Sequence, residues 1–397
     1  MSIFKYITIL IAILLSVNIY SFCEHHNKKE CLKFNDFIKL NIVKNSKLAD
    51  FALDKTGNKY ILLNTKLDKK DVFFISKIDK NQKLIWSRYI KGLAHNILLN
   101  SKNEVIVSSD ITGDIKLESK NYSFNTKSLL ILKLEHTKGK LKKHLFISTN
   151  YSVVPTALSL DGDDIYIAGY YGGKSDILTS SKNIAYEDAF LLVLDINLKK
   201  KWARTFIKAG FNYIDDIKIF SENIYLSLKR SSYYTNTLMK INKKSPKAKP
   251  KELKSVNIKS FDIDANENIY LINSATLFLM KYDKDFKEIY NKELNKSKKF
   301  LTPSEVIVKN DSLFIKYIAN VDYKKNILIS NYNLELKNNW HFAIIGQTQT
   351  RNKLMIFNNN LFLFGEFNSN LTFLDKDFFT NKISPFILDF NLLPSKL

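Results

Sequence analysis

The chain has 397 residues, of which 45% are hydrophobic and 13% aromatic, so it can bury a large core and is not a disordered tail. Its 2 cysteines exclude a disulfide-stapled fold, and its 11 glycines exclude a collagen-like one. Lys and Arg outnumber Asp and Glu by 61 to 39, which gives a net charge of +22.

The positive charge is carried almost entirely by lysine. Arginine occurs only at Arg88, Arg204, Arg230 and Arg351. Because base and phosphate recognition depends on the bidentate arginine fork, we expect no nucleic-acid partner. A lysine-rich surface nevertheless attracts anions of other kinds.

Residues 1–22 predict a secretory signal peptide. Lys5 precedes an uncharged apolar run over residues 6–17, which is too short to cross the ~30 Å hydrocarbon core as a helix. No later apolar run approaches the length of a membrane span. We therefore expect an exported protein, periplasmic or extracellular, without a membrane span.

Residues 23–33 form a short segment in which Cys23 and Cys31 flank His25 and His26. An oxidising compartment favours a Cys23–Cys31 disulfide. Acylation or removal of Cys23 is the first alternative, and acylation would attach the protein to the cell envelope. Binding of a transition metal is the second, but the spacing matches no metal motif. We predict no metal and no cofactor.

The remainder of the chain repeats a turn followed by a strand rich in β-branched and aromatic residues. Seven copies occur, 44 to 61 residues apart, and their equivalent positions are Tyr60, Val105, Tyr166, Tyr225, Tyr270, Phe314 and Phe362. An apolar stretch precedes each copy, which makes a β-hairpin pattern. A third apolar stretch follows each copy, and a fourth begins at Trp86, Trp202 and Trp340. Four strands per repeat predict an all-β fold, a seven-bladed β-propeller of four-stranded antiparallel blades over residues 34–397.

The third repeat, residues 157–171 and 188–195 up to Trp202, resembles the bacterial β-propeller repeat of the SBBP type. Residues 77–86 are also similar to the blade ending of quinoprotein-like, PQQ-type repeats. The resemblance covers nearly all of residues 49–393 and implies blades without identifying an activity. Most glycines of the family pattern are replaced here by Lys, Asn or Ser.

The seventh repeat has only three strands before the sequence ends, whereas residues 34–43 precede the first repeat and alternate like an edge strand. We therefore expect this N-terminal segment to close the last blade as its outer strand.

Long connections between second and third strands, at residues 109–128, 169–188 and 365–384, predict where a ligand binds. Two tyrosine pairs leave second strands on that face and form a candidate ligand face: Tyr170, Tyr171, Tyr233 and Tyr234. The alternative is packing between adjacent blades. On the opposite face, lysine-rich turns form an outer rim around acidic turns nearer the axis.

Catalytic signatures are sparse. Inner strands supply His95, Asp215, Asp216, Asp262 and Glu305, at positions that do not align between repeats, and no nucleophile elbow, phosphate loop or HExxH motif occurs. We therefore predict an exported, monomeric, non-catalytic scaffold that binds a protein or glycan partner. The alternatives are a periplasmic propeller enzyme of lactonase or quinoprotein type and an envelope-assembly lipoprotein.

Overall fold

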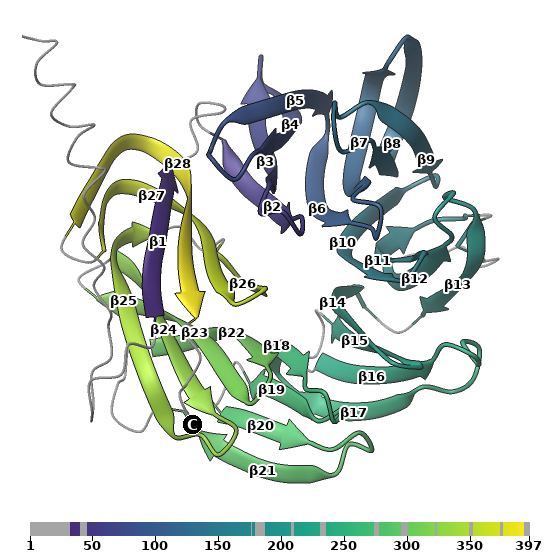
Figure 1. The fold of residues 1–397 in the computed structure, drawn as a ribbon. Coiled ribbons are helices and arrows are strands. Elements are labelled where there is room, and N and C mark those ends of the chain that lie inside the picture. Colours follow the sequence, from purple (N-terminus) through teal and green to yellow (C-terminus); the bar gives the residue numbers. More distant parts are fainter. Residues whose placement is uncertain are drawn as a thin grey trace, which may run out of the picture.

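The computed structural model describes residues 32–39, 46–175, 177–178, 187–207, 210–230, 236–273, 278–294, 301–321, 324–348, 352–373 and 376–392. These residues form 28 β-strands, arranged as sheets around a central axis (Figure 1). No helix in the described part of the chain is long and apolar enough to cross a membrane.

The first two sheets contain the strands between residues 47 and 206. The first sheet consists of β2 (Lys47–Leu53), β3 (Lys59–Leu67), β4 (Lys70–Ile78) and β5 (Leu84–Lys91). The second sheet begins with β6 (Leu93–Leu99), β7 (Val105–Leu117), β8 (Lys120–Leu134) and β9 (Leu141–Ile147). It continues with β10 (Ser152–Asp161), β11 (Asp164–Gly172), β12 (Asp188–Leu194) and β13 (Lys200–Phe206).

Three further sheets complete the ring. The third consists of β14 (Asn212–Phe220), β15 (Asn223–Arg230), β16 (Asn236–Asn242) and β17 (Lys251–Val256). The fourth consists of β18 (Ile258–Ile263), β19 (Ile269–Asn273), β20 (Phe278–Tyr282) and β21 (Glu288–Glu293). The fifth contains β22 (Leu301–Lys309), β23 (Ser312–Val321), β24 (Lys324–Asn333), β25 (Asn338–Thr348), β26 (Lys353–Phe357), β27 (Asn360–Phe373), β28 (Lys376–Leu392) and β1 (Leu32–Lys39).

The expectation of seven separate blades is wrong, because the hydrogen-bonded sheets number five. Two of them are eight-stranded, and each joins two successive antiparallel meanders of four strands. In the second sheet the long strand β8 reaches β10 and pairs with it in parallel at Lys127↔Ser152. In the fifth sheet the far end of β25 pairs with β27, starting at Ile345↔Thr372. Strands that run beyond their own meander therefore merge neighbouring units.

An N-terminal strand does form one edge of the fifth sheet. β1 pairs antiparallel with β28, from Leu32↔Leu392 to Lys39↔Phe386. The strand begins and ends earlier than the predicted residues 34–43, and residues 40–43 lie outside the described part of the chain. The two ends of the chain are thus joined within one sheet.

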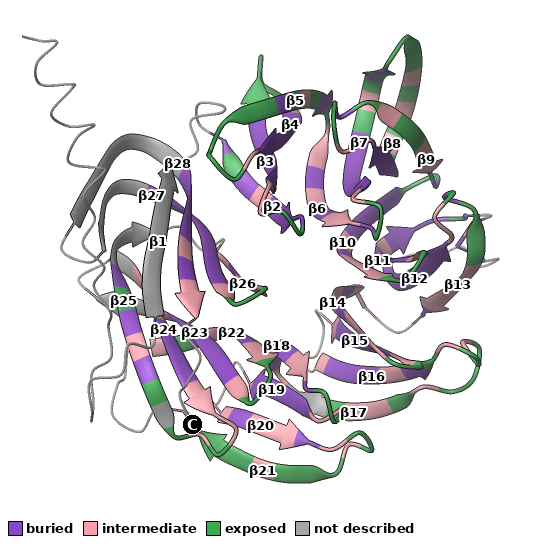
Figure 2. Cartoon of the chain, in the orientation of Figure 1, coloured by how far each residue is buried: buried purple, intermediate pink, exposed green. Residues whose placement is uncertain are grey.

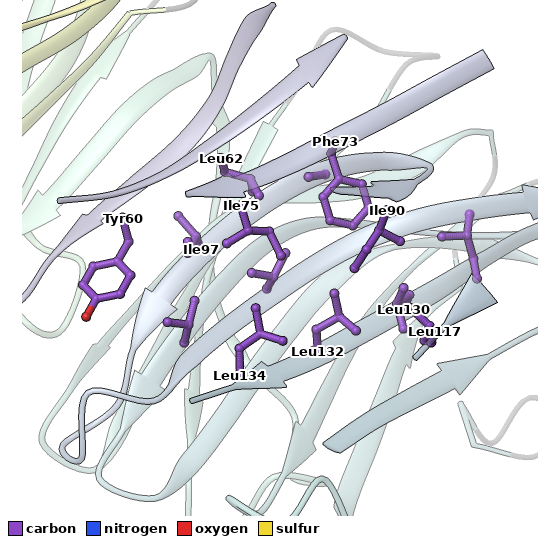
Figure 3. Packing of buried hydrophobic residues seen from close by; sticks show 14 of the residues in the cluster. Tyr60, Leu62, Phe73, Ile75, Ile90, Ile97, Leu117, Leu130, Leu132 and Leu134 are labelled. Atoms are coloured by element: carbon purple, nitrogen blue, oxygen red, sulfur yellow. The ribbon is translucent and has the colours of Figure 1, made fainter. Parts of the chain in front are cut away.

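The core lies between the sheets (Figure 2). Apolar runs such as residues 60–63 and 129–132 are buried along their whole length, because each is covered on both faces of its sheet. The largest interface joins the first and second sheets, where Leu62 and Phe73 pack with Ile97 and Leu132 (Figure 3). A second interface joins the first and fifth sheets, where the ring of Phe51 stacks on Phe364.

The hairpin turns keep one geometry although they lack most of the expected glycines. In most of these turns an Asp or Asn side chain accepts two backbone N–H groups, as Asp195 does from Asn197 and Lys199, both at 2.8 Å, while Asp79 accepts that of Lys83 at 2.8 Å. The residue before the end of the turn has positive φ. Seven turns share this position, and a glycine occupies it in only one of the seven. The residues and their φ angles are Gly57 (85°), Gln82 (67°), Asn103 (58°), Leu198 (58°), Glu267 (63°), Phe286 (63°) and Leu336 (65°). The side-chain bonds therefore hold a conformation that glycine would adopt without strain.

Candidate functional site

The strands nearest the axis share a local irregularity. Six of them, β2, β6, β10, β14, β18 and β22, have a register shift against their second strand near the start. The extra residues are Ala49, His95, Thr156, Asp215, Lys259 and Ser304. A β-bulge re-aims the side chain at that position, so these six residues ring the axis with orientations that regular strands would not give.

The side chain that follows three of these bulges bonds to the next inner strand. Asp50 Oδ2 accepts the backbone N–H of Ile97 at 3.0 Å. Ser260 Oγ accepts that of Val306 at 3.2 Å, and Glu305 Oε2 accepts that of Leu354 at 2.9 Å. Asp262 Oδ2 likewise accepts the N–H of Val308 at 2.8 Å. These polar side chains thus tie adjacent inner strands together.

This arrangement corrects the expectation that the inner-strand carboxylates do not align between repeats. Once the bulge is counted, Asp50, Asp216 and Glu305 occupy the same position of their strands. Asp216 and Glu305 lie nine residues before the repeat positions Tyr225 and Phe314, respectively, so these two align in the sequence as well. Asp50 and Glu305 therefore have a structural role shared between repeats.

A pocket of about 240 Å³ opens where the first, second and fifth sheets meet at the axis. It is lined by Leu48, Ala49, Asp50, Ala94, His95, Asn352 and Lys353. The residues come from β2, β6 and the start of β26, so the pocket lies at the end of the inner strands that carries the bulges. It combines an apolar side with four polar side chains.

His95 is held by a carboxylate. Its Nε2 contacts Asp110 Oδ1, on the neighbouring strand β7. The Asp110 side chain is 7% exposed, whereas that of His95 is 27% exposed. The imidazole is thus fixed from the inside and open toward the pocket.

Lys353 is held in the same way from the other side of the pocket. Its Nζ contacts Asp50 Oδ1, while the other oxygen of Asp50 is bonded to Ile97. The Asp50 side chain is 4% exposed and that of Lys353 is 44% exposed. Each of these two basic side chains at the pocket thus has a buried carboxylate behind it.

A second charged group lies further around the axis. Lys218 Nζ lies 3.5 Å from Asp262 Oδ1, and Lys229 contacts Asp215. Burial raises the pKa of Asp216, while the Asp262 carboxylate raises the pKa of Lys218. Within the described residues no group of three or more His, Cys, Asp or Glu side chains is placed to hold a metal ion.

The tyrosines of the candidate ligand face differ in their surroundings. Tyr171 is fully buried and packs edge-to-face on Phe190, with ring centroids 6.2 Å apart. Tyr170 is partly exposed, and its ring centroid lies 5.0 Å from that of Phe211, which precedes β14 of the next sheet. Of these two tyrosines, Tyr170 alone therefore has a ring at the surface. Tyr233, Tyr234, Cys23 and Cys31 lie outside the described residues.

The acidic turns and the lysine-rich strands of the opposite face are largely paired. Glu104 contacts Lys142 at 2.6 Å and Lys133 at 3.4 Å. Lys201 contacts Asp164 at 2.7 Å, and Lys243 contacts Asp161 at 2.5 Å. Much of the charge in the two predicted rims is therefore neutralised within the protein.

Sequence reasoning named His95 and missed its partner. Asp110 lies in the middle of the second strand β7 and has no motif around it. Asn352 and Lys353 come from the seventh repeat, more than 250 residues from His95, and they reach the pocket only because the ring closes. In the sequence, this site is indicated by the position of His95 near the start of an inner strand.

Comparison with known proteins agrees on the fold. No family model matches the chain, and no curated protein matches it. Virginiamycin B lyase from Staphylococcus aureus is similar in structure, with a TM-score of 0.53, 10% sequence identity, and 90% of this chain and 99% of that chain covered. A catalytically inactive histidine-to-alanine variant of that lyase with quinupristin gives a TM-score of 0.50 at the same identity and coverage. At this identity the likeness shows an all-β propeller fold.

Proposed function

We propose that this protein is an exported, non-catalytic binding propeller that holds one sugar ring of a glycan in the axial pocket. The observation that carries the proposal is the pair of basic side chains, His95 and Lys353, each fixed by a buried carboxylate and each open to the pocket. Preorganised polar side chains of this kind lose little conformational entropy on binding.

The size and lining of the pocket fit a sugar ring. Its volume of about 240 Å³ lies below the roughly 300–1,000 Å³ of pockets for drug-sized ligands, which favours a single ring. Asp50 and Asn352 supply acceptors, Lys353 supplies donors, and His95, whose Nε2 faces Asp110, presents its other ring nitrogen. Leu48, Ala49 and Ala94 form an apolar wall for the C–H face of the ring.

The inner-strand carboxylates support a binding role over a catalytic one. Asp50, Glu305 and Asp262 each accept a backbone N–H of the next inner strand. A carboxylate used in this way is held in place as part of the ring. It is thereby less suited to exchange protons with a substrate.

A glycan array followed by titration calorimetry tests the proposal. We expect His95→Ala and Lys353→Met each to weaken binding of the selected glycan at least tenfold, since each removes a hydrogen-bonding group from the pocket. His144→Gln is the matched control, because His144 lies on β9 away from the pocket and contacts Tyr122. Unchanged affinity in both pocket variants would refute the axial site.

Export is tested separately by the intact mass of the mature protein. Loss of residues 1–22 lowers the mass by about 2–2.5 kDa from 46.1 kDa. Full-length protein recovered in the membrane fraction after alkaline washing would contradict export with cleavage.

The contact of His95 with Asp110 favours one second candidate, a propeller enzyme in which His95 is a general base. Hydrolysis of a panel of sugar lactones, followed by acid release, tests it. Turnover that is lost in His95→Ala, with an unchanged melting temperature, would replace the binding proposal by this one.

A further inference from the structure

A groove on the perimeter, away from the axial pocket, has a different character. It has a volume of about 270 Å³ and runs between β5 and the strands β7, β8 and β9. Its lining is Ser87, Arg88, Tyr89, Ile90, Lys116, Leu117, Glu118, Leu134 and Leu141. Four consecutive residues of β5 form one wall, a length of about 13 Å in a strand.

The wall formed by β5 is an unpaired sheet edge. Within the described residues β5 is hydrogen-bonded as a strand to β4 alone. The opposite wall includes the far end of the hairpin of β7 and β8, which projects beyond the other strands of its sheet (Figure 1). A sheet edge of this kind is a template for an added strand.

Exposed apolar side chains concentrate on this sheet. Tyr89 is 66% exposed, Leu84 48% and Ile85 46%, all three on β5. Leu67, at the end of β3 in the same sheet, is 43% exposed. Exposed apolar groups gathered beside a groove indicate an interaction surface.

The charges of the groove select an acidic occupant. Arg88 and Lys116 line it, and its one acid, Glu118, is already bonded to Arg88 at 3.2 Å. Lys91, at the end of β5, adds a further positive charge. A second copy of this chain paired along β5 would bring a second Arg88 and a second Lys91 to the same edge, and like charges that face one another across paired strands are destabilising.

We infer that this groove docks an extended segment of a partner protein in which acidic and apolar residues alternate, added as a strand along β5. A carboxylate of the segment takes the place of Glu118 on Arg88. Both side chains of the present pair are partly exposed, at 36% and 47%, so breaking it costs little. The inference is independent of the axial pocket.

A fluorescein-labelled peptide of eight alternating Glu and Val residues is the probe, titrated with the full chain and followed by fluorescence anisotropy. We expect saturable binding that weakens as salt is added. Arg88→Ala should weaken binding about fivefold or more, because it removes the charge-assisted bond. Glu118→Gln should tighten binding about two- to fivefold, because it frees Arg88 from its present partner.

Two controls separate the groove from general attraction to a basic protein. Asp285→Asn frees Lys251, whose exposed pair with Asp285 at 3.0 Å lies elsewhere on the perimeter, and it should leave the titration unchanged. A peptide with alternate backbone nitrogens methylated keeps its charge and should lose binding, since it cannot pair as a strand.

Three results would overturn the inference. The first is no saturable binding, or equal binding by the native chain, Arg88→Ala and Glu118→Gln. The second is equal binding of the methylated peptide or an equal gain in Asp285→Asn. The third is a dimer in sedimentation that Arg88→Ala dissociates, which would make the groove an interface between copies.

Discussion

The carboxylate of Asp50 on β2 accepts the backbone N–H of Ile97 on β6, so a side chain joins two inner strands that belong to different sheets. Ser260 on β18 joins Val306 on β22 of the next sheet in the same way, and within the fifth sheet Glu305 on β22 joins Leu354 on β26. Adjacent inner strands diverge from the axis and do not pair as a ladder, so a polar side chain supplies the missing hydrogen bond. The ring is therefore held by more than apolar packing between sheets.

Glu305 gives the sharpest test of these ties. Besides Leu354, it contacts Lys316 at 2.6 Å, and the Lys316 side chain is only 4% exposed. Glu305→Gln leaves that ammonium buried without its carboxylate, so we expect a loss of about 3 kcal/mol in the free energy of unfolding, measured in urea.

Glu335→Gln is the control for that loss. Glu335 pairs with Lys337 at 3.1 Å, and both side chains are more than 70% exposed. Its effect should stay within about 0.5 kcal/mol. Equal effects of the two substitutions would show that Glu305 does not tie the inner strands.

The fold class could be predicted because its signals are local. Each turn and the strand after it repeat within a few residues, and Tyr60, Tyr225 and Tyr270 all lie buried at the position that the repeat assigns. The number of sheets could not be predicted in this way. It depends on two pairings between distant strands, Lys127↔Ser152 and Ile345↔Thr372, that leave no trace in the repeat.

The site was harder to predict than the fold. The bulges change which residue faces the axis, and Asp216 and Glu305 each directly follow a bulge residue. The contact of His95 with Asp110 depends on such a bulge, and the place of Lys353 depends on closure of the ring. Sequence periodicity therefore predicts the strands of the fold, whereas the site depends on how those strands are aligned with one another.

A matched pair of turn substitutions tests the strained hairpins. Gln82 is exposed with φ of 67°, and Gly57 occupies the same turn position with φ of 85°. We expect Gln82→Gly to raise stability, and Gly57→Gln to lower it, each by about 1 kcal/mol. Thermal melting of both variants measures the effect, and a shift of the same sign in the two would contradict it.

Removal of the N-terminal strand tests closure of the fifth sheet. Deleting residues 32–39 removes the whole pairing of β1 with β28, and we expect a loss of at least about 3 kcal/mol. A chain that lacks only residues 23–31 is the control and should melt like the mature protein. Unchanged melting after the longer deletion would refute closure by β1.

Glu104 predicts a pH dependence. Glu104 is 7% exposed, and its carboxylate accepts hydrogen bonds from Lys142 at 2.6 Å and from Asn100 at 2.8 Å. The ammonium group of Lys133 lies 3.4 Å from the same carboxylate. Burial alone would raise the pKa of Glu104, but these bonds and charges outweigh burial and lower the pKa to about 2. A carboxyl whose pKa is lower in the folded state binds its proton more weakly there than in the unfolded chain. Its contribution to stability is therefore complete above the ordinary pKa of 4.5 and lost as the pH falls toward 2.

We expect Glu104→Gln to lower the free energy of unfolding by roughly 2 kcal/mol at pH 7 and to have little effect near pH 2, because native Glu104 is itself becoming neutral there. Urea titrations of both proteins between pH 2 and 7 measure the difference. Glu222→Gln serves as the control, since Glu222 forms only an exposed pair with Lys244 at 3.4 Å. A difference for Glu104→Gln that is the same at every pH would mean that its charge contributes nothing and that only packing was lost.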